Sequence, residues 1–221
     1  MDWDGIVRAL PHDLQDHVWA LYKQRLQGQR DGRHRRLAAT FVEQAVTLCN
    51  DVVAAGYLLD WMAHMVQYPH AKPPTAIVLV GHEECGVSVL VTLLSRLIPT
   101  LQTHDPRDVY GTRNGRMAAA KLVVIEQADQ LSVSSLKSLI RDPHVLIRER
   151  GVAQLVPSFH HLLLTTRELR PSLYDRRFVP IHCAERPSSE YAGTLHQILT
   201  TPALDAVRDV LRARPLHGRT W

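Results

Sequence analysis

The sequence predicts an α/β fold, with a parallel β-sheet at the core and flanking helices toward both ends of the chain. Short aliphatic runs such as Ile77–Val80 and Leu122–Ile125 alternate with segments of helical periodicity. This alternation is typical of parallel sheets whose strands are buried on both faces. The first run leads into Gly81-x-x-x-x-Gly86-x-Ser88, the spacing of a phosphate-binding loop in which backbone N–H groups and a helix N-terminus face an anion. We therefore expect a P-loop-like sheet with a ligand site at the carboxyl ends of its strands.

The composition is that of an ordinary globular protein with a mild basic excess. Of the 221 residues, 45% are hydrophobic and 22% are charged, and the net charge of +4 permits contact with nucleic acid without requiring it. The three cysteines have no paired spacing, which argues against a disulfide framework or a zinc site. With no secretion signal and no apolar run of membrane-spanning length, the chain is expected to be intracellular, in a cell or a virus-infected one, without a membrane partner.

The N-terminal third is expected to be mostly helical. Residues 3–27 carry a stripe of leucine and valine typical of a helix. Residues 28–36 form a polar break with four arginines, which fits either a solvated linker or a phosphate-contacting loop. A long helical pattern then covers 37–67, with a break expected near Gly56, and stops before Pro69.

The rest of the chain alternates between short strands and helices. Charged residues at Arg148–Gly151 separate two apolar runs, which predicts a β-hairpin over 145–156 with a charged tip. Ser132 is placed to cap the helix that precedes this hairpin. The remaining elements are expected to be helices at 87–98, 132–141 and 189–214, buried strands at 76–80, 122–125, 159–165 and 178–181, and a polar loop over 99–116.

Several short segments between residues 40 and 185 occur in an order that is informative. They are Tyr57–Pro69, Lys72-Pro73, the strand and loop at 76–88, Asn114-Gly115, Lys121–Glu126, Leu136–Ile140, Arg150-Gly151, Phe159–Thr166 and Asp175–Phe178. Together they resemble the ATPase domain of primase-helicases from viruses, phages and plasmids, the poxvirus-type branch of helicase superfamily 3 within the AAA+ class. The resemblance implies four segments: an N-terminal helical segment and basic linker over 1–36, a collar-like helical segment over 37–70, an AAA+ core over 71–186 and a C-terminal helical tail over 187–221.

The loop that the resemblance marks as a nucleotide site lacks a residue that the chemistry needs. In that family a loop lysine neutralises the outer phosphates, and the next residue binds magnesium through its hydroxyl. Ser88 matches, but Val87 stands in place of the lysine. The missing charge-assisted hydrogen bond is worth about 1.5–3 kcal/mol. Glu83 and Glu84 also lie in the loop, and a carboxylate about 5 Å from a phosphate charge costs roughly 3 kcal/mol at an effective dielectric of 20.

Two further positions depart from the family's pattern. Its second strand normally ends in two acids that hold magnesium and orient the attacking water, but here Ile125 precedes Glu126. Glu126 is therefore expected to be either a general base or a strand-end carboxylate paired with an arginine. Thr166 stands where the family places a polar sensor of the γ-phosphate, usually asparagine. The resemblance therefore assigns nucleotide binding to Gly81, Gly86, Val87, Ser88 and Thr166. Magnesium, if bound, would be held by Ser88 and Glu126.

An arginine pair near the fourth strand is the next candidate. Arg176 and Arg177 match arginines that the family projects toward a neighbouring subunit's nucleotide, where they stabilise developing phosphoryl charge. In this reading the chain completes a partner's site while being inert itself. The alternative is a surface pair bonded to Asp175 or Glu168.

The charged hairpin tip matches the family element that faces the central channel of a ring and contacts the DNA backbone. Arg148 and Arg150 retain this capacity, because phosphate contact needs charge and donors and no sequence-specific geometry. The alternative is a solvated turn.

The sequence thus predicts a degenerate, helicase-like AAA+ protein, a pseudo-ATPase without a cofactor. It would act as a homo- or hetero-oligomer, with DNA as a partner, in the replication system of a virus or mobile element. The first alternative is an active ATP-dependent DNA helicase with an atypical loop, which would bind ATP and magnesium. The second is a structural assembly protein that kept only the fold.

Overall fold

A five-stranded, all-parallel sheet forms the centre of the molecule, as expected for the α/β fold. The structure, a computed structural model, describes residues 32–82, 85–105, 107–112, 114–127, 132–184 and 199–216. The helix expected at 3–27, the start of the one expected at 189–214, and Glu83 and Glu84 lie outside these residues. In spatial order the strands are β2 (Thr100–Thr103), β3 (Leu122–Ile125), β6 (His161–Thr166), β1 (Ala76–Val80) and β7 (Phe178–His182).

The strand order places the first strand inside the sheet. Strand β1 pairs in parallel with β6 on one side and with β7 on the other. The chain leaves β1, continues at the far edge with β2, returns strand by strand to β6, and then crosses to β7. The direction of travel reverses beside β1, and in open α/β sheets ligands bind outside the carboxyl ends of strands at such a point.

The loop expected over 99–116 is interrupted by an edge strand, so that prediction is wrong at its start. Strand β2 pairs only with β3, and its inward-facing Leu101 and Thr103 alternate with the exposed Gln102. With only four residues, three of them polar, the strand is too short and too polar to show an alternation in the sequence. The rest of the segment contains α6 (Arg107–Tyr110) and the 3-10 helix η2 (Gly115–Ala119).

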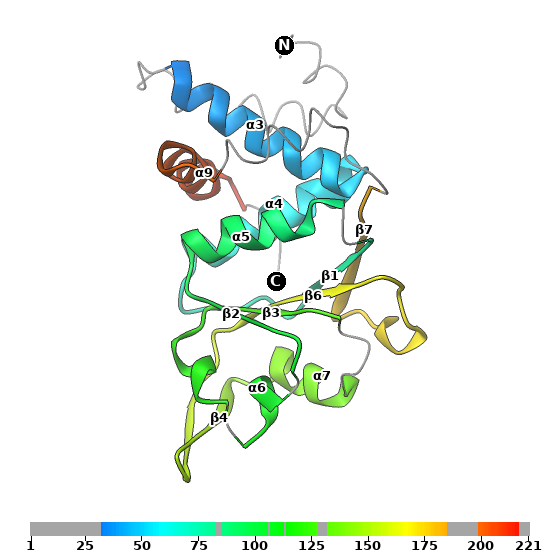
Figure 1. Cartoon of the computed structure of the whole chain (residues 1–221), viewed down its shortest axis with the longest axis vertical. Coiled ribbons are helices and arrows are strands. Elements are labelled where there is room, and N and C mark those ends of the chain that lie inside the picture. The colour runs from blue at the N-terminus through cyan, green and yellow to red at the C-terminus, as the bar shows by residue number, and fades with distance from the viewer. Residues whose placement is uncertain are drawn as a thin grey trace.

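Helices cover one face of the sheet and a mixed layer covers the other (Figure 1). Alternate residues of each strand point to opposite faces, so Ile77 and Leu79 contribute to the helical side while Val78 and Val80 contribute to the other. The helical side consists of α3 (Gly32–Cys49), α4 (Val52–Gln67), α5 (Val87–Leu97) and α9 (Thr201–Ala213). The other side consists of α6, η2, α7 (Val133–Arg141) and the antiparallel hairpin of β4 (His144–Glu149) and β5 (Val152–Pro157).

The N-terminal helices depart from the prediction in two ways. Helix α3 begins at Gly32, so residues 32–36 of the expected polar break are helical. The interruption before α4 falls at Asn50 and Asp51 instead of near Gly56. Asn50 adopts a left-handed conformation with φ 47°, and the Asp51 carboxylate accepts a hydrogen bond from the backbone N–H of Ala54 at 2.6 Å, which caps α4.

Helix α9 is fastened to α4 by buried polar contacts. The Arg214 guanidinium pairs with Asp60, and both side chains are buried. The Gln67 amide donates hydrogen bonds to the carbonyl oxygens of Leu211 and Arg214, at 2.8 Å and 2.7 Å. These bonds satisfy carbonyl groups at the end of α9 that have no partner within the helix.

Lys72, in the linker before β1, also holds the end of a helix, on the face of the sheet opposite to α9. Its Nζ donates hydrogen bonds to the carbonyl oxygens of Leu139 and Asp142, at 2.7 Å and 2.6 Å, and so holds the C-terminal end of α7. None of the helices within the described ranges combines the length and apolar character that crossing a membrane requires.

Candidate nucleotide pocket and nucleic-acid hairpin

The loop between β1 and α5 depends on its two glycines. A Cβ at Gly81 would lie 2.9 Å from the Cys183 Cβ and 3.1 Å from the Cys85 Sγ, which is closer than neighbouring atoms allow. Gly86 has φ 95°, a left-handed conformation that suits glycine, and immediately precedes the first turn of α5. The glycine spacing therefore has a geometric cause in this fold.

An open pocket of about 760 Å³ lies above this loop. It is at the carboxyl ends of β1, β3 and β6, where the strand order predicts a ligand site. Five of the predicted positions line it, because parallel strands end at the same edge of the sheet. These are Gly81, Val87, Ser88, Glu126 and Thr166.

The residues at the positions of the family's lysine and first acid are aliphatic. Val87 is partly buried against the helical side of the core. Ile125 is fully buried on the other side of the sheet. Neither side chain offers a charge or a ligand atom, so the described part of the pocket lacks the lysine and the paired acids that the resemblance implies.

The polar residues that remain at the strand ends are bonded to protein groups. The Glu126 carboxylate accepts a hydrogen bond from the Gln102 amide at 2.9 Å. This partner is an amide and not the arginine that one of the two alternatives for Glu126 predicted. The Thr166 hydroxyl donates to the backbone carbonyl of Glu168 at 2.8 Å. Ser88 is exposed at the start of α5. The Glu126 carboxylate and the Ser88 hydroxyl alone are a poor fit to magnesium, which favours carboxylates together with phosphate oxygens.

Two cysteines lie beside the loop, next to Gly81. A hydrogen bond from the Cys183 thiol lowers the pKa of Cys85. The same contact, together with burial, raises the pKa of Cys183 well above its usual range. The two thiols therefore influence each other directly, and neither belongs to the described lining of the pocket.

Arg167 is a pocket residue that the sequence alone did not mark. It follows β6 and lines the pocket beside Thr166, together with His82 and His104. No motif points to these three side chains, because each lies in a connection whose path is set by the sheet. Arg167 is the cation that reaches the described lining of this pocket.

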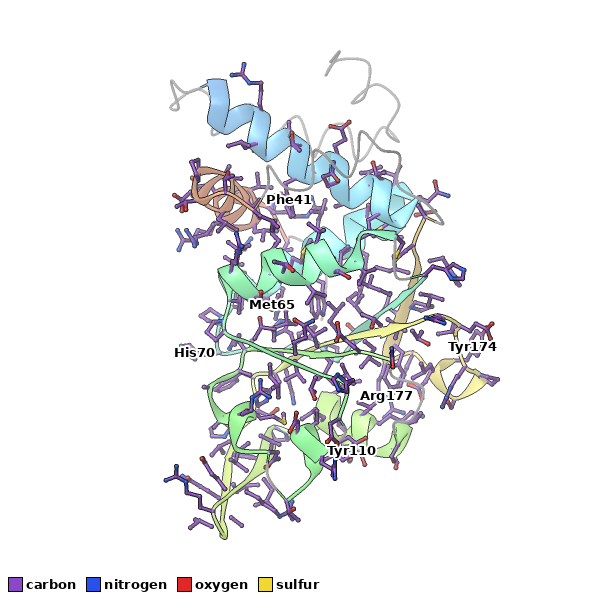
Figure 2. All side chains as sticks on the ribbon, viewed as in Figure 1. Phe41, Met65, His70, Tyr110, Tyr174 and Arg177 are labelled. Carbon is purple, nitrogen blue, oxygen red and sulfur yellow. The ribbon has the colours of Figure 1, made fainter. Side chains whose placement is uncertain are left out.

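The arginine pair after η4 (Pro171–Leu173) lies outside the pocket lining. Arg177, labelled in Figure 2, forms two hydrogen bonds with the Asp175 carboxylate, at 2.8 Å and 2.9 Å. Lys137 also contacts Asp175, at 2.9 Å, and the Arg177 side chain holds the pKa of that carboxyl far below its usual range. Arg176 is exposed, and among the described residues its side chain has no ion pair. Of the two, Arg176 is thus the more exposed side chain.

The predicted hairpin is present and ends in a tight turn. Strands β4 and β5 pair from His144–Pro157 to Glu149–Val152, which leaves Arg150 and Gly151 as the two central residues. Both have positive φ, 50° and 82°, and such two-residue turns match the twist of paired strands. Arg150 is exposed at the tip.

Asn114 attaches the hairpin to the rest of the domain. Its buried amide donates to the carbonyl oxygen of Leu146 at 2.9 Å, and its Oδ1 accepts from the backbone N–H of Arg148 at 2.7 Å. The next residue, Gly115, allows close approach, since a Cβ there would lie 2.8 Å from the Glu149 carboxylate. These contacts fix the position of Arg148 relative to the sheet.

Comparisons with known proteins identify similar structures and no sequence family. Neither a protein-family model nor a curated protein matches the chain. The A form apo structure of the NrS-1 C terminal region superimposes with a TM-score of 0.63 at 19% identity, covering 77% of this chain and 44% of that one. An apo structure of the same region gives a TM-score of 0.59 at 20% identity, with 75% and 44% covered.

The chain has a P-loop NTPase-like fold. It spans less than half the length of the NrS-1 region that it matches. Within the P-loop NTPase-like fold, the glycine loop, the strand-end carboxylate and the pocket occupy the expected places, while the lysine position and the first acidic position hold aliphatic side chains.

Proposed function

We propose that this chain is a helicase-like P-loop domain that has lost ATP hydrolysis and works as a DNA-binding or assembly component of an oligomer. Its setting would be the replication system of a virus or mobile element. The fold, the order of the sequence segments and the retained hairpin support the helicase-like part of this proposal. The pocket chemistry supports the loss of hydrolysis.

The observation that carries the proposal is that aliphatic side chains, Val87 and Ile125, stand at the two positions where the chemistry needs charge. Val87 packs against the core, and Ile125 has no exposed surface. Phosphoryl transfer relies almost entirely on positioning and electrostatic stabilisation, so a site without the lysine and without a metal-binding acid has lost its main source of catalysis.

An active ATP-dependent helicase is the second candidate, favoured by the open pocket and by Arg167. The volume of about 760 Å³ leaves room for a nucleotide. Arg167, or an arginine from a neighbouring subunit, would have to take over the role of the missing lysine. In this candidate Glu126 serves as the general base, and Ser88 and Glu126 hold magnesium.

Titration calorimetry with ATP and magnesium separates the two candidates. We expect no binding tighter than about 1 mM, which corresponds to roughly 4 kcal/mol, and no phosphate release above the buffer rate. Micromolar binding with magnesium-dependent turnover that is lost in Arg167→Ala would establish the active enzyme instead.

DNA binding by the hairpin is tested by fluorescence anisotropy with single-stranded DNA across a salt series. The double variant Arg148→Ala/Arg150→Ala is expected to weaken binding and to reduce the slope of log K against log salt by about 1–2, because each phosphate contact contributes nearly one unit. Arg170→Ala, which removes an exposed arginine elsewhere, is the matched control and should bind normally. If DNA binding is absent, or present but insensitive to salt, the chain is a structural assembly protein.

A further inference from the structure

A second pocket, of about 580 Å³, opens at the opposite end of the sheet. Pro99, Lys121 and Phe159 line it just before β2, β3 and β6 begin, so it lies at the amino ends of the strands. Helix α9 contributes Arg208 and Arg212 from the helical layer. The length of the strands therefore separates this amino-end pocket from the nucleotide pocket.

The amino-end pocket is lined by cations without any acid. Lys121, Arg208 and Arg212 reach it, and none of its described lining residues is an aspartate or glutamate. Arg208 is neutralised by Asp205 at 2.6 Å. Lys121 and Arg212 have no ion pair with any described residue. Within the part of the chain that the structure describes, two positive charges therefore face the pocket without a carboxylate partner.

Lys121 is held in an environment that disfavours its charge. Its Nζ lies 5.0 Å from the centre of the Phe159 ring, and burial lowers the pKa of its ammonium group. The ring face attracts the cation but does not replace a carboxylate. A bound anion would stabilise the Lys121 ammonium group, which burial has already removed from water. The desolvation of this group is therefore not an added cost when an anion binds.

The remaining walls are apolar and aromatic. His70 packs edge-on against Phe159 with ring centres 5.7 Å apart, and Met65 and Ile98 line the same cavity. Met65 and His70 are both labelled in the left half of Figure 2. The volume of the amino-end pocket is within the range that encloses a small molecule of nucleotide size. Cations beside an apolar wall suit a ligand with a phosphate and a planar, uncharged part.

We infer that the amino-end pocket binds a nucleotide unit, with its phosphate on Lys121 and Arg212 and its base against the apolar wall beside Phe159. The unit is either a free nucleotide or one residue of a single strand. Val156 and Pro157 at the end of β5 also line the pocket, so it borders the base of the hairpin. The inference does not require the hairpin to bind DNA.

The test uses the full chain with Lys121→Met and Arg212→Ala, and with Arg170→Ala as a control for the loss of one exposed arginine. Lys121→Met keeps the length of the side chain over Phe159. Arg212 is exposed on α9, so its removal leaves folding intact even if Lys121→Met proves unstable. Binding of a fluorescein-labelled oligothymidine and of AMP is measured by anisotropy and by competition at fixed salt.

Each pocket variant is expected to weaken binding by about tenfold or more, the loss of one charge-assisted contact, while Arg170→Ala changes it less than twofold. Lys121→Arg should retain most of the affinity. Competition by AMP identifies the free nucleotide as the ligand, and binding of the oligonucleotide alone identifies the strand. The inference is wrong if both pocket variants bind both probes as the unaltered chain does. Loss of binding in these variants but not in Arg148→Ala/Arg150→Ala would uphold this pocket while removing the proposed role of the hairpin.

Discussion

The two pockets at opposite ends of the sheet differ in the charge that they present. The pocket at the carboxyl ends has the glycine loop and the strand-end Glu126, but Val87 in place of a lysine. The amino-end pocket has Lys121 and Arg212 and no acid among its described lining. Topology fixes where a crevice forms, whereas the side chains that reach it fix what it binds. Retention of a phosphate-binding fold therefore does not ensure that phosphate binds at its usual end.

The largest expected effect concerns the helix that carries Arg212. Asp60→Ala would leave the buried Arg214 without its carboxylate, and breaking a buried pair in this way costs about 3–5 kcal/mol of unfolding free energy. Urea unfolding measures this loss. We expect the amino-end pocket to be disrupted before the pocket at the carboxyl ends.

The control for Asp60→Ala is Asp205→Ala on α9 itself. Asp205 pairs with Arg208 at the surface, with 58% of its side chain exposed, so its removal should cost less than about 1 kcal/mol. Equal losses for the two variants would show that burial of the Asp60–Arg214 pair is not what fastens α9.

Acidification should destabilise the amino end of the sheet. Burial, together with the His64 ring 3.2 Å away between ring nitrogens, lowers the pKa of His161 to about 3. Because the unfolded chain binds a proton near pH 6.5 and the folded chain does not, stability present above that pH is lost as the pH falls below it. Between pH 7.5 and 4.5 this group removes on the order of 2–3 kcal/mol.

Urea unfolding at several pH values measures the acid effect. His161→Gln should flatten the dependence, while His144→Gln, a change at an exposed histidine of β4, should leave it unchanged. A profile that stays flat between pH 7.5 and 4.5 in the unaltered chain would mean that His161 is protonated without cost.

The smallest expected effect tests the pocket at the carboxyl ends. Val87→Lys supplies one cation and is expected to strengthen ATP binding by about tenfold, or 1.4 kcal/mol. Ser95→Lys adds the same charge at an exposed position further along α5 and should have no effect. If neither variant gains affinity in calorimetry, the loop does not present its backbone to phosphate.

Much of the fold could be predicted, because buried parallel strands have a strong local signal. The aliphatic runs at 76–80 and 122–125 became β1 and β3 at the expected residues. The edge strand β2 was missed because three of its four residues are polar. Gly56 was expected to break a helix, but it lies inside α4, where its carbonyl oxygen accepts a hydrogen bond from Arg214 at 3.2 Å. Such a contact, made across 158 positions of sequence, leaves no local pattern.

The two pockets were predictable to very different degrees. The loop and strand-end residues of the pocket at the carboxyl ends share a recognisable spacing in the sequence. The parallel strands bring these residues to one edge of the sheet. Lys121, Phe159 and Arg212 come from three distant segments with no common motif, so only the folded chain shows that they share a cavity. The functional roles of the predicted residues, including Arg176 and Arg150, remain predictions.

The attachment of α9 to α4 has a consequence for how the chain folds. The hydrogen-bond partners of Gln67 and Asp60 lie more than 140 positions later in the sequence. Closing so long a loop is slow compared with forming local helices. During synthesis, the apolar stripe shared by α3 and α4 stays uncovered until residues 201–213 leave the ribosome. This interval is when the growing chain is most exposed to aggregation and to chaperone binding.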